Sequence, residues 1–208
     1  MPIWISLQKN VIIRSYQNKM TKTLYLLRHC STKDSELGIN GSRTDTPLSE
    51  KGLLQARELA NILLNYQFDL LIVSPLQRTL QTIEPYLNTL KEKPEVVVDP
   101  LTLERDLGLL TNSVNSDGKI PESIVASGKP KTEWIPPDGE STLQVYNRAK
   151  KFLEKVKKRQ ENKILICGHQ NFLRCLELVI RKILLSDENF YSGEPPRLEF
   201  GELRKYRL

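Results

Sequence analysis

Residues 24–33 read LYLLRHCSTK, and this largely apolar run leads directly into Arg28 and His29. The chain has one other histidine, His169, which also follows an apolar run, in KILICGHQNF at residues 163–172. A short continuous apolar run bounded by polar residues is typical of a buried strand. Both histidines are therefore expected at the end of a strand.

Strand-like and helix-like segments alternate from residue 23 onwards. The expected strands are TLYLL (23–27), DLLIV (69–73), EVVVD (95–99) and KILIC (163–167). Apolar residues recur at helical spacing in 48–66, 74–90 and 141–156, and again from residue 172. Continuous apolar strands alternating with helices indicate an α/β fold, a three-layer αβα sandwich with a mostly parallel central sheet.

Capping signals indicate where these helices begin. Ser49 is the expected N-cap of the first helix. The pairs Ser74 with Gln77 and Ser141 with Gln144 have the spacing of capping boxes for the second and third helices.

The polar residues that follow the four strands are unusual for one chain. They are Arg28 and His29, Ser74 and Arg78, Glu104 and Arg105, and Gly168 and His169. Parallel strands end at one edge of a sheet, where such sheets bind ligands. Helix amino-termini beginning at Ser74 and near Gln170 would add free N–H groups there, which favour an anion. Together these features predict a phosphate site.

Phosphoryl transfer needs a nucleophile and positive charge around the phosphoryl oxygens. A neutral imidazole attacks phosphorus when its other N–H is held by an acceptor, so either His29 or His169 is a candidate nucleophile. The other histidine would then donate to the phosphoryl group. Arg28 and Arg78 supply planar guanidinium groups that suit phosphate oxygens.

The leaving oxygen also needs a proton, and LERDLG at residues 103–108 offers two donors, Glu104 and Asp106. Taken singly, a strand-end histidine or a helix-start arginine is more often a packed or salt-bridged residue than a catalyst. Both histidines of the chain at one sheet edge favour an active site instead.

These motifs resemble the histidine phosphatase superfamily, also called the phosphoglycerate mutase-like family. The family signature, an apolar strand ending in Arg-His-Gly and then Ser or Thr, is matched by LLRHCST with Cys30 in place of the glycine. Further matching segments are RTDTPLSEKGLLQA, VSPLQRTLQT, LERDLG, PPDGES and ICGHQNFLR. The likeness runs from about residue 24 to the last residue.

The resemblance implies a histidine phosphatase domain over residues 23–208. It implies that His29 is phosphorylated in an intermediate and that Glu104 is the proton donor and later the base. The residues implied to hold the phosphoryl group are Arg28, Arg78 and His169, with Thr32 and the N–H of Gln170 as helpers. Cys30 is expected either to narrow the pocket or to expose the site to oxidation. Gln170, in place of a common glycine, weakens the expectation of backbone donation there.

The expected function is hydrolysis of a small phosphorylated metabolite. Phosphoglycerate mutase is the alternative within the family. A cap insertion at about residues 109–137 is expected to roof the crevice, and it holds Lys119, Lys129 and Lys131 but no arginine, which favours hydrolysis. From another class, a non-catalytic phosphoprotein-binding module would have lost His29 or Glu104. The cysteine-phosphatase spacing in CLELVIR (175–181) lies in a helical pattern and forms no phosphate loop.

Composition and charge indicate which kinds of partner and cofactor to expect. The net charge of +6 is scattered, and aromatic residues are too dispersed for a nucleic-acid surface. The basic stretches 157–163 and 203–208 read as a solvated helix face and a tail. No apolar run is long enough for a membrane span, and no spacing of metal ligands or cofactor motif is present. We expect no metal, cofactor, nucleic-acid or membrane partner; the sequence indicates no oligomeric state.

Three cysteines, an odd number, suit buried thiols in a reducing compartment, so a cytoplasmic location is expected. Residues 1–22 interrupt their apolar residues with Lys9, Arg14 and Lys19 and lack a signal-peptide core. They are interpreted as an N-terminal extension, either an additional docking strand or a poorly ordered segment. Met20 is an alternative start of the natural chain.

Overall fold

The computed structural model describes residues 21–114, 125–126, 128–193 and 196–208. The strands are β1 (Thr23–Arg28), β2 (Leu70–Val73), β3 (Glu95–Val98), β4 (Lys163–Gly168) and β5 (Leu203–Arg207). The helices are α2 (Lys33–Glu36), α3 (Glu50–Leu63), α4 (Gln77–Thr89), α6 (Thr142–Lys157), α7 (Gln170–Ile180) and α8 (Asp187–Tyr191). Short 3-10 turns lie at Pro100–Thr102, Gly108–Leu110 and Lys131–Glu133. The interpretations of residues 1–20 and of the middle of the insertion fall outside the described residues.

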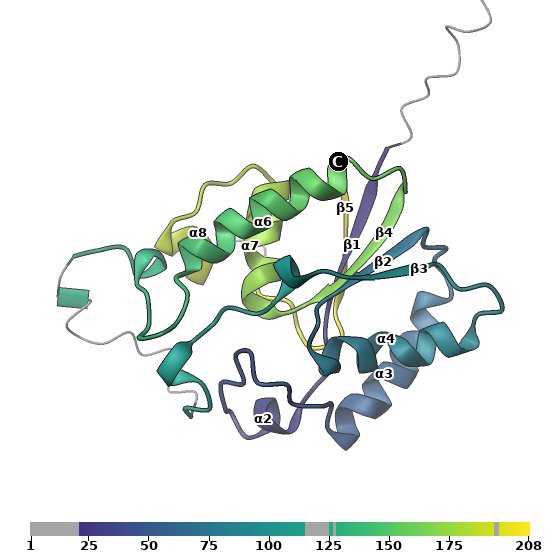
Figure 1. Ribbon diagram of the computed structural model, residues 1–208, viewed down its shortest axis with the longest axis horizontal. Helices are drawn as coiled ribbons and strands as arrows, with labels where there is room; N and C mark the ends of the chain where they lie inside the picture. The colour runs from purple at the N-terminus through teal and green to yellow at the C-terminus, as the bar shows by residue number, and fades with distance from the viewer. Residues whose placement is uncertain (1–20, 115–124, 127, 194–195) are drawn as a thin grey trace, which may run out of the picture.

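One sheet runs through the centre of the molecule in the order β3-β2-β4-β1-β5 (Figure 1). The first four of these strands are parallel, as predicted, and β5 pairs antiparallel with β1. The reading of residues 203–208 as a solvated tail is therefore wrong. Leu203 packs in the core on the α3–α4 side of the sheet, and Tyr206 packs in the core on the α6–α7 side. Backbone pairing of β5 to β1 holds the charged residues between them at the sheet edge.

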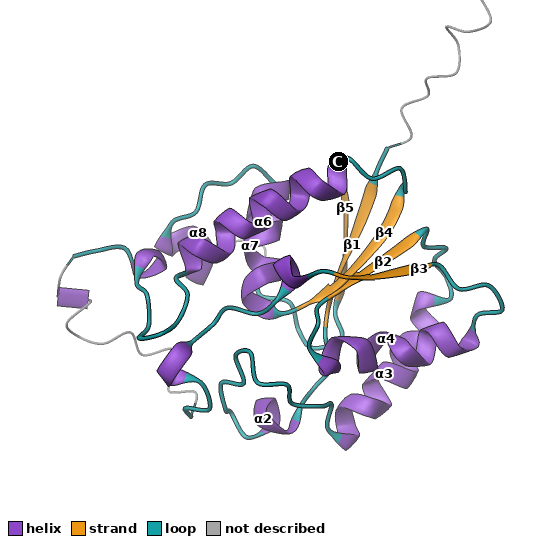
Figure 2. Cartoon of the chain, in the orientation of Figure 1, coloured by secondary structure: helices purple, strands orange, loops and turns teal. Residues whose placement is uncertain are grey.

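Helices cover both faces of this sheet, which confirms the three-layer prediction (Figure 2). Alternate residues of β1 point to opposite sides, since side chains alternate along a strand. Leu24 and Leu26 join the core under α6 and α7. Tyr25 and Leu27 join the core under α3 and α4.

Two of the three predicted caps are present. The Ser49 hydroxyl accepts from the N–H of Gly52 at the start of α3, and Ser141 and Gln144 form a capping box at the start of α6. Gly52 is needed for space, because a Cβ at that position would lie 2.0 Å from the carbonyl oxygen of Ser31. This close approach packs the start of α3 against the segment that follows β1.

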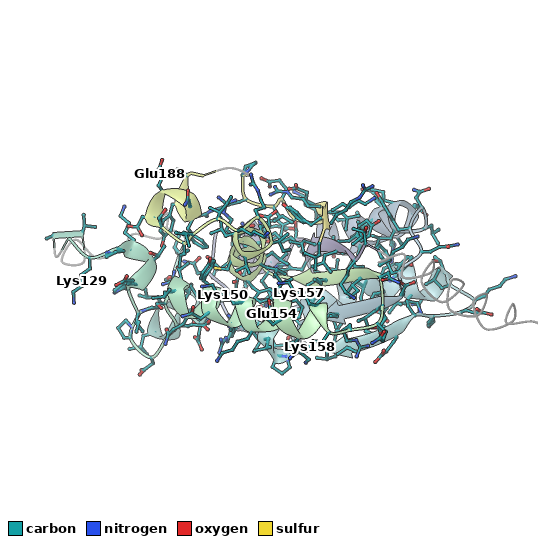
Figure 3. The ribbon with its side chains drawn as sticks, turned by 90° about the horizontal axis from the view of Figure 1, so that it is seen from above. Lys129, Lys150, Glu154, Lys157, Lys158 and Glu188 are labelled. Carbon is teal, nitrogen blue, oxygen red and sulfur yellow. The ribbon has the colours of Figure 1, made fainter. Side chains whose placement is uncertain are left out.

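The outer face of α6 is charged, but most of residues 157–163, expected as a solvated helix face, lies outside the helix, because α6 ends at Lys157 and β4 begins at Lys163. Lys150, Glu154 and Lys157 of this helix, and Lys158 directly after it, lie on the surface (Figure 3). Glu154 and Lys157 form an ion pair of 2.7 Å. Among the described residues, no helix combines the length and apolar character that a membrane crossing requires.

Candidate active site

The four parallel strands bring the expected residues to one edge of the sheet. Arg28, the last residue of β1, lies beside Gly168, the last residue of β4. The pairing continues beyond both strands, because the His29 N–H donates to the carbonyl of Gly168 at 3.1 Å and the Ser74 N–H donates to Cys167 at 3.2 Å. The two histidine rings come to 5.1 Å between centroids.

His29 is held in one tautomer. Its Nδ1 lies 2.7 Å from the carbonyl oxygen of Cys30, and a carbonyl only accepts, so Nδ1 carries the proton. Nε2 has no hydrogen-bond partner in the described part of the chain, and the ring lines a cavity. Burial, followed by the charges of Arg78 and Arg28, holds the pKa of His29 well below its usual range. The ring is therefore neutral at pH 7 with an unprotonated Nε2 available to attack.

His169 has the opposite arrangement. The Nε–H of Arg78 donates to its Nδ1 at 3.2 Å, which places the ring proton on Nε2. That Nε2–H donates to the Ser74 hydroxyl at 2.7 Å. His169 is fully buried and does not line the cavity, and burial and the charge of Arg78 lower its pKa well below the usual range. Both ring nitrogens are occupied by the protein.

The prediction that Ser74 caps the second helix is wrong. Helix α4 begins at Gln77, and its N-cap position, Leu76, makes no side-chain hydrogen bond. Ser74 is tied to the sheet by its N–H and to His169 by its hydroxyl, so it remains outside the helix. The local sequence is compatible with a capping box, but a partner far away in the chain takes the hydroxyl.

The helix amino-termini also differ from expectation. At α4 the N–H of Gln77 is bound by Asp45 at 2.7 Å. At α7 the N–H of Asn171 is bound by both oxygens of Glu104, at 3.1 and 3.3 Å. The protein's own carboxylates therefore occupy N–H groups that were expected to face the ligand.

The arginines form the positive part of the site. Arg78 is buried, and besides His169 it donates to the carbonyls of Thr44 at 2.6 Å and Ser42 at 2.7 Å. Arg28 donates to the carbonyl of Leu198 at 2.7 Å, and its guanidinium lies 3.6 Å above the Phe200 ring. Burial is the main cause that lowers the pKa of Arg28 to about 10, so it stays charged at pH 7.

Of the two candidate acids, the structure brings only Glu104 to the cavity. Its backbone carbonyl accepts from Arg148 at 3.2 Å and from Arg43 at 3.1 Å, which fixes the loop after β3. Asp106 instead pairs with Arg43 at 3.3 Å and accepts from the N–H of Gly108 at 2.9 Å. Asp106 is thus used in the loop.

Thr32 and Gln170 both line the cavity. The Thr32 hydroxyl accepts from the N–H of Ser35 as the N-cap of α2. Neither polar atom of the Gln170 side-chain amide has a partner among the described residues, although both are buried.

Cys30 does not narrow the cavity, contrary to expectation. Its side chain is fully buried in the core on the α3–α4 side of the sheet. A Cβ on Gly201 would lie 3.5 Å from its Sγ, so the thiol faces the turn before β5. Burial raises the pKa of Cys30 to about 11, which keeps the thiol protonated and, with its burial, argues against the expected oxidation.

The cavity measures about 270 Å³, and its lining comes mainly from segments that follow strands. The lining residues are Arg28, His29, Thr32, Asp34, Ser35, Ile39, Asn40, Gly41, Ser42, Arg78, Glu104, Arg105, Leu107, Gln170, Asn171, Arg197 and Phe200. The sequence argument missed Arg197 and Phe200, which precede β5. The only sequence signal was the arginine-aromatic composition of RLEFGELRKY, and that stretch had no predicted strand to place it. In the described part of the chain no group of three or more His, Cys, Asp or Glu residues is arranged to hold a metal ion.

The fold and this set of side chains define the class of protein. It is an α/β protein with a small pocket at the carboxyl ends of its parallel strands, lined by a neutral histidine, arginines and one well-placed glutamate. Within that class the chain belongs to the histidine phosphatase superfamily (branch 1), whose family model matches residues 24–189.

Curated relatives include phosphatases and a mutase. The chain is 33% identical over 147 residues to fructose-2,6-bisphosphatase TIGAR B of Danio rerio, a match covering 67% of this chain and 55% of that protein. It is 30% identical over 170 residues to phosphoserine phosphatase 1 of Hydrogenobacter thermophilus, covering 78% of each. It is 32% identical over 199 residues to the 2,3-bisphosphoglycerate-dependent phosphoglycerate mutase of Methanosarcina mazei, covering 79% of this chain and 80% of the mutase. The chain thus spans about half the length of the zebrafish relative.

Solved structures share the fold. The alpha-ribazole phosphatase from Shigella flexneri superposes with a TM-score of 0.74 at 23% identity, covering 88% of this chain and 89% of that one. A mycobacterial glucosyl-3-phosphoglycerate phosphatase gives a TM-score of 0.72 at 23% identity, covering 88% and 92%. These likenesses show that the chain shares the arrangement of sheet and helices seen in these structures.

Proposed function

We propose that this protein is a phosphomonoester hydrolase that acts on a small phosphorylated metabolite through a phosphohistidine intermediate. The observation that carries the proposal is the state of His29. Its Nδ1–H is held by the Cys30 carbonyl while its unprotonated Nε2 faces a cavity lined by Arg28, Arg78 and Glu104. The named phosphatases among the relatives support the same reaction class.

The reaction proceeds in two transfers. Nε2 of His29 attacks phosphorus, the bond between phosphorus and the ester oxygen breaks, and Glu104 gives its proton to the departing oxygen. Water then attacks the phosphohistidine, Glu104 takes the proton of that water, and inorganic phosphate leaves. Arg28 and Arg78 offset the charge on the phosphoryl oxygens in both steps. His169 acts here through Arg78, which it holds by a hydrogen bond.

The whole-chain organisation fits this role. We interpret residues 23–208 as the catalytic domain and residues 1–22 as an extension. The start of the cap insertion pairs with the cavity wall, because the Asn40 N–H donates to the carbonyl of Ser113 at 2.9 Å and the Asn112 N–H donates to that of Asn40 at 2.8 Å. This supports a cap that lies beside the opening and sets specificity.

Hydrolysis is favoured over mutase chemistry by the insertion. A mutase must retain its intermediate between two transfers, which requires positioned cations and exclusion of water. The insertion at residues 109–137 contains three lysines and no arginine. The similarity to the phosphoglycerate mutase from Methanosarcina mazei is the observation that supports the mutase alternative. A non-catalytic binding module is disfavoured because the chain retains both His29 and Glu104.

Phosphate release by the purified protein, measured over a panel of phosphomonoesters, tests the proposal. We expect inorganic phosphate from small esters, and little 2-phosphoglycerate from 3-phosphoglycerate with a bisphosphoglycerate primer in a coupled enolase assay. Isomerisation that outpaces release by a wide margin would move the assignment to a mutase. EDTA should leave the rate unchanged, because Arg28 and Arg78 supply the positive charge that a metal supplies in other phosphatases. Loss in EDTA with recovery on adding a divalent ion would show a metal requirement.

A further inference from the structure

Arg197 contributes a cation to the cavity from a part of the chain remote from the signature motifs. Its side chain is exposed and lines the same cavity as His29 and Arg28. Among the described residues, its guanidinium has no ion-pair or hydrogen-bond partner. A charged group with no protein partner at the mouth of a polar cavity is available to a ligand.

The segment that carries Arg197 is firmly attached to the core. Arg204 on β5 donates to the carbonyls of Pro196 at 2.7 Å and Arg197 at 3.2 Å. Arg204 itself pairs with the fully buried Glu177 of α7 at 3.0 Å. The next residue, Leu198, is fully buried and its carbonyl receives Arg28. The backbone around Arg197 is therefore held in place next to the phosphoryl-binding arginine.

Arg28 and Gln170, which both line this cavity, carry unsatisfied polar groups. The Nε–H of Arg28 and both polar atoms of the Gln170 amide are buried without a partner among the described residues. Buried polar groups are normally hydrogen-bonded, so a ligand toward which these side chains turn would supply the partners that they lack. Burial first lowers the pKa of Arg28, Glu104 and Glu199 oppose this, and the charge of Arg197 lowers it further, so an anion between Arg28 and Arg197 would offset the repulsion between the two arginines.

The charges in the lining do not balance with a phosphate alone. Four arginines line the cavity, namely Arg28, Arg78, Arg105 and Arg197, together with the carboxylates Asp34 and Glu104. When Glu104 carries the proton that it donates, Asp34 is the one charged carboxylate of the lining against its four arginines, which leaves three positive charges within the lining. A phosphate dianion supplies two negative charges, and one cation remains for another acidic group.

We infer that Arg197, with Gln170 in the same cavity lining, forms a subsite for a second acidic group, so that the preferred substrates are phosphomonoesters that also carry a carboxylate or a second phosphate. This inference rests on the proposed function and names its substrate class. The phosphoryl group lies against His29 and Arg28, and the second acidic group extends toward Arg197 at the mouth.

A matched pair of compounds tests the subsite. 3-Phosphoglycerate and glycerol 3-phosphate differ in having a carboxylate or a hydroxymethyl group at the end opposite the phosphate. Wild-type protein should have the higher kcat/KM for 3-phosphoglycerate, and Arg197→Gln should lower that value about tenfold, the order expected for one charge-assisted hydrogen bond. The value for glycerol 3-phosphate should change less than about twofold, since no contact to Arg197 is lost. Arg197→Lys should recover part of the loss, because charge is kept while the planar fork is not.

Arg57→Gln is the matched control, since Arg57 is an exposed arginine of α3 that does not line the cavity. It should affect neither compound. Fructose 1,6-bisphosphate against fructose 6-phosphate repeats the comparison for a second phosphate and shows which acidic group the subsite prefers. Equal losses on both members of each pair, or no loss from Arg197→Gln, would overturn the inference.

Binding separates this inference from the proposed function. The affinity of full-length His29→Ala protein for 3-phosphoglycerate and glycerol 3-phosphate is measured by calorimetry, with and without Arg197→Gln. Wild-type protein that releases no phosphate from any ester, yet with a preference for 3-phosphoglycerate that depends on Arg197, would overturn hydrolysis and keep the subsite. Phosphate release without that preference would keep hydrolysis and overturn the subsite.

Discussion

The carboxyl ends of β1 and β4 lie side by side and both are followed by a histidine, but the two histidines are held differently. His29 has one nitrogen bound and the other open to the cavity. His169 has both nitrogens bound, by Arg78 and Ser74, and is fully buried. From the sequence alone either could be the nucleophile. The comparison shows that hydrogen-bond partners, rather than position on the sheet, distinguish the two rings, and this difference supports the proposal that His29 is the nucleophile.

The largest effect is expected at the β1 end. His29→Asn should lower turnover by about 10³-fold or more, because among the described residues that line the cavity no other imidazole offers an open nucleophilic nitrogen. Labelled substrate quenched during turnover should leave an acid-labile, alkali-stable label on the wild-type protein and none on the variant. Label retained by His29→Asn but absent from His169→Asn would reverse the two roles.

The next effect concerns Glu104, which binds the start of α7 directly after His169. Glu104→Gln should cost about 10²–10⁴-fold on alkyl phosphates, the usual range for general acid catalysis. Nitrophenyl phosphate should lose less, because its leaving group needs less protonation. Asp106→Asn is the control, since Asp106 pairs with Arg43 outside the cavity lining. A larger loss from Asp106→Asn than from Glu104→Gln would place the acid there.

The third prediction tests whether Ser74 and His169 act as one unit. Ser74→Ala leaves the buried Nε2–H of His169 without an acceptor, so we expect about 1–3 kcal/mol of lost stability and a loss of a few-fold in kcat. The double variant with His169→Asn should be no slower than His169→Asn alone. Ser49→Ala removes the N-cap of α3 and should cost about 0.5–2 kcal/mol with kcat unchanged. Additive losses in kcat for the Ser74 and His169 variants would contradict the coupling.

The smallest expected effect is on the pH dependence of stability, and both histidines contribute to it. Each has a pKa held well below its usual range by burial first and then by the charge of Arg78. Below pH 6.5 the unfolded chain binds protons that the folded protein does not. Stability is therefore fully present above that pH and falls as the pH drops toward the folded pKa, by at most about 1.4 kcal/mol per pH unit for each histidine.

Urea unfolding between pH 7 and pH 5 measures this dependence. His29→Asn and His169→Asn should each reduce the slope by a similar amount, since both rings are neutral when folded. A slope that one of the two variants leaves unchanged would show that the corresponding histidine is already protonated in the folded protein.

The features that could be predicted from the sequence depended largely on residues that lie close together in the chain. Apolar runs and helical spacing gave the four parallel strands and their flanking helices, because burial periodicity is a local property. The rule that parallel strands end at one edge then brought Arg28, His29, Arg78 and Glu104 together, and the motifs identified the family. The caps at Ser49 and Ser141 were also predicted, since their partners lie three residues away.

Only the tertiary structure decided which partner each polar group takes. Ser74 has the local pattern of a cap, yet its hydroxyl lies 2.7 Å from a histidine 95 residues further along the chain. Cys30 turns into the core, β5 pairs as an edge strand in a charged stretch, and Arg197 reaches the cavity beside Arg28. Each outcome depends on contacts between segments far apart in sequence, and hydrogen-bond and charge partners of that kind leave no periodic signal in the sequence.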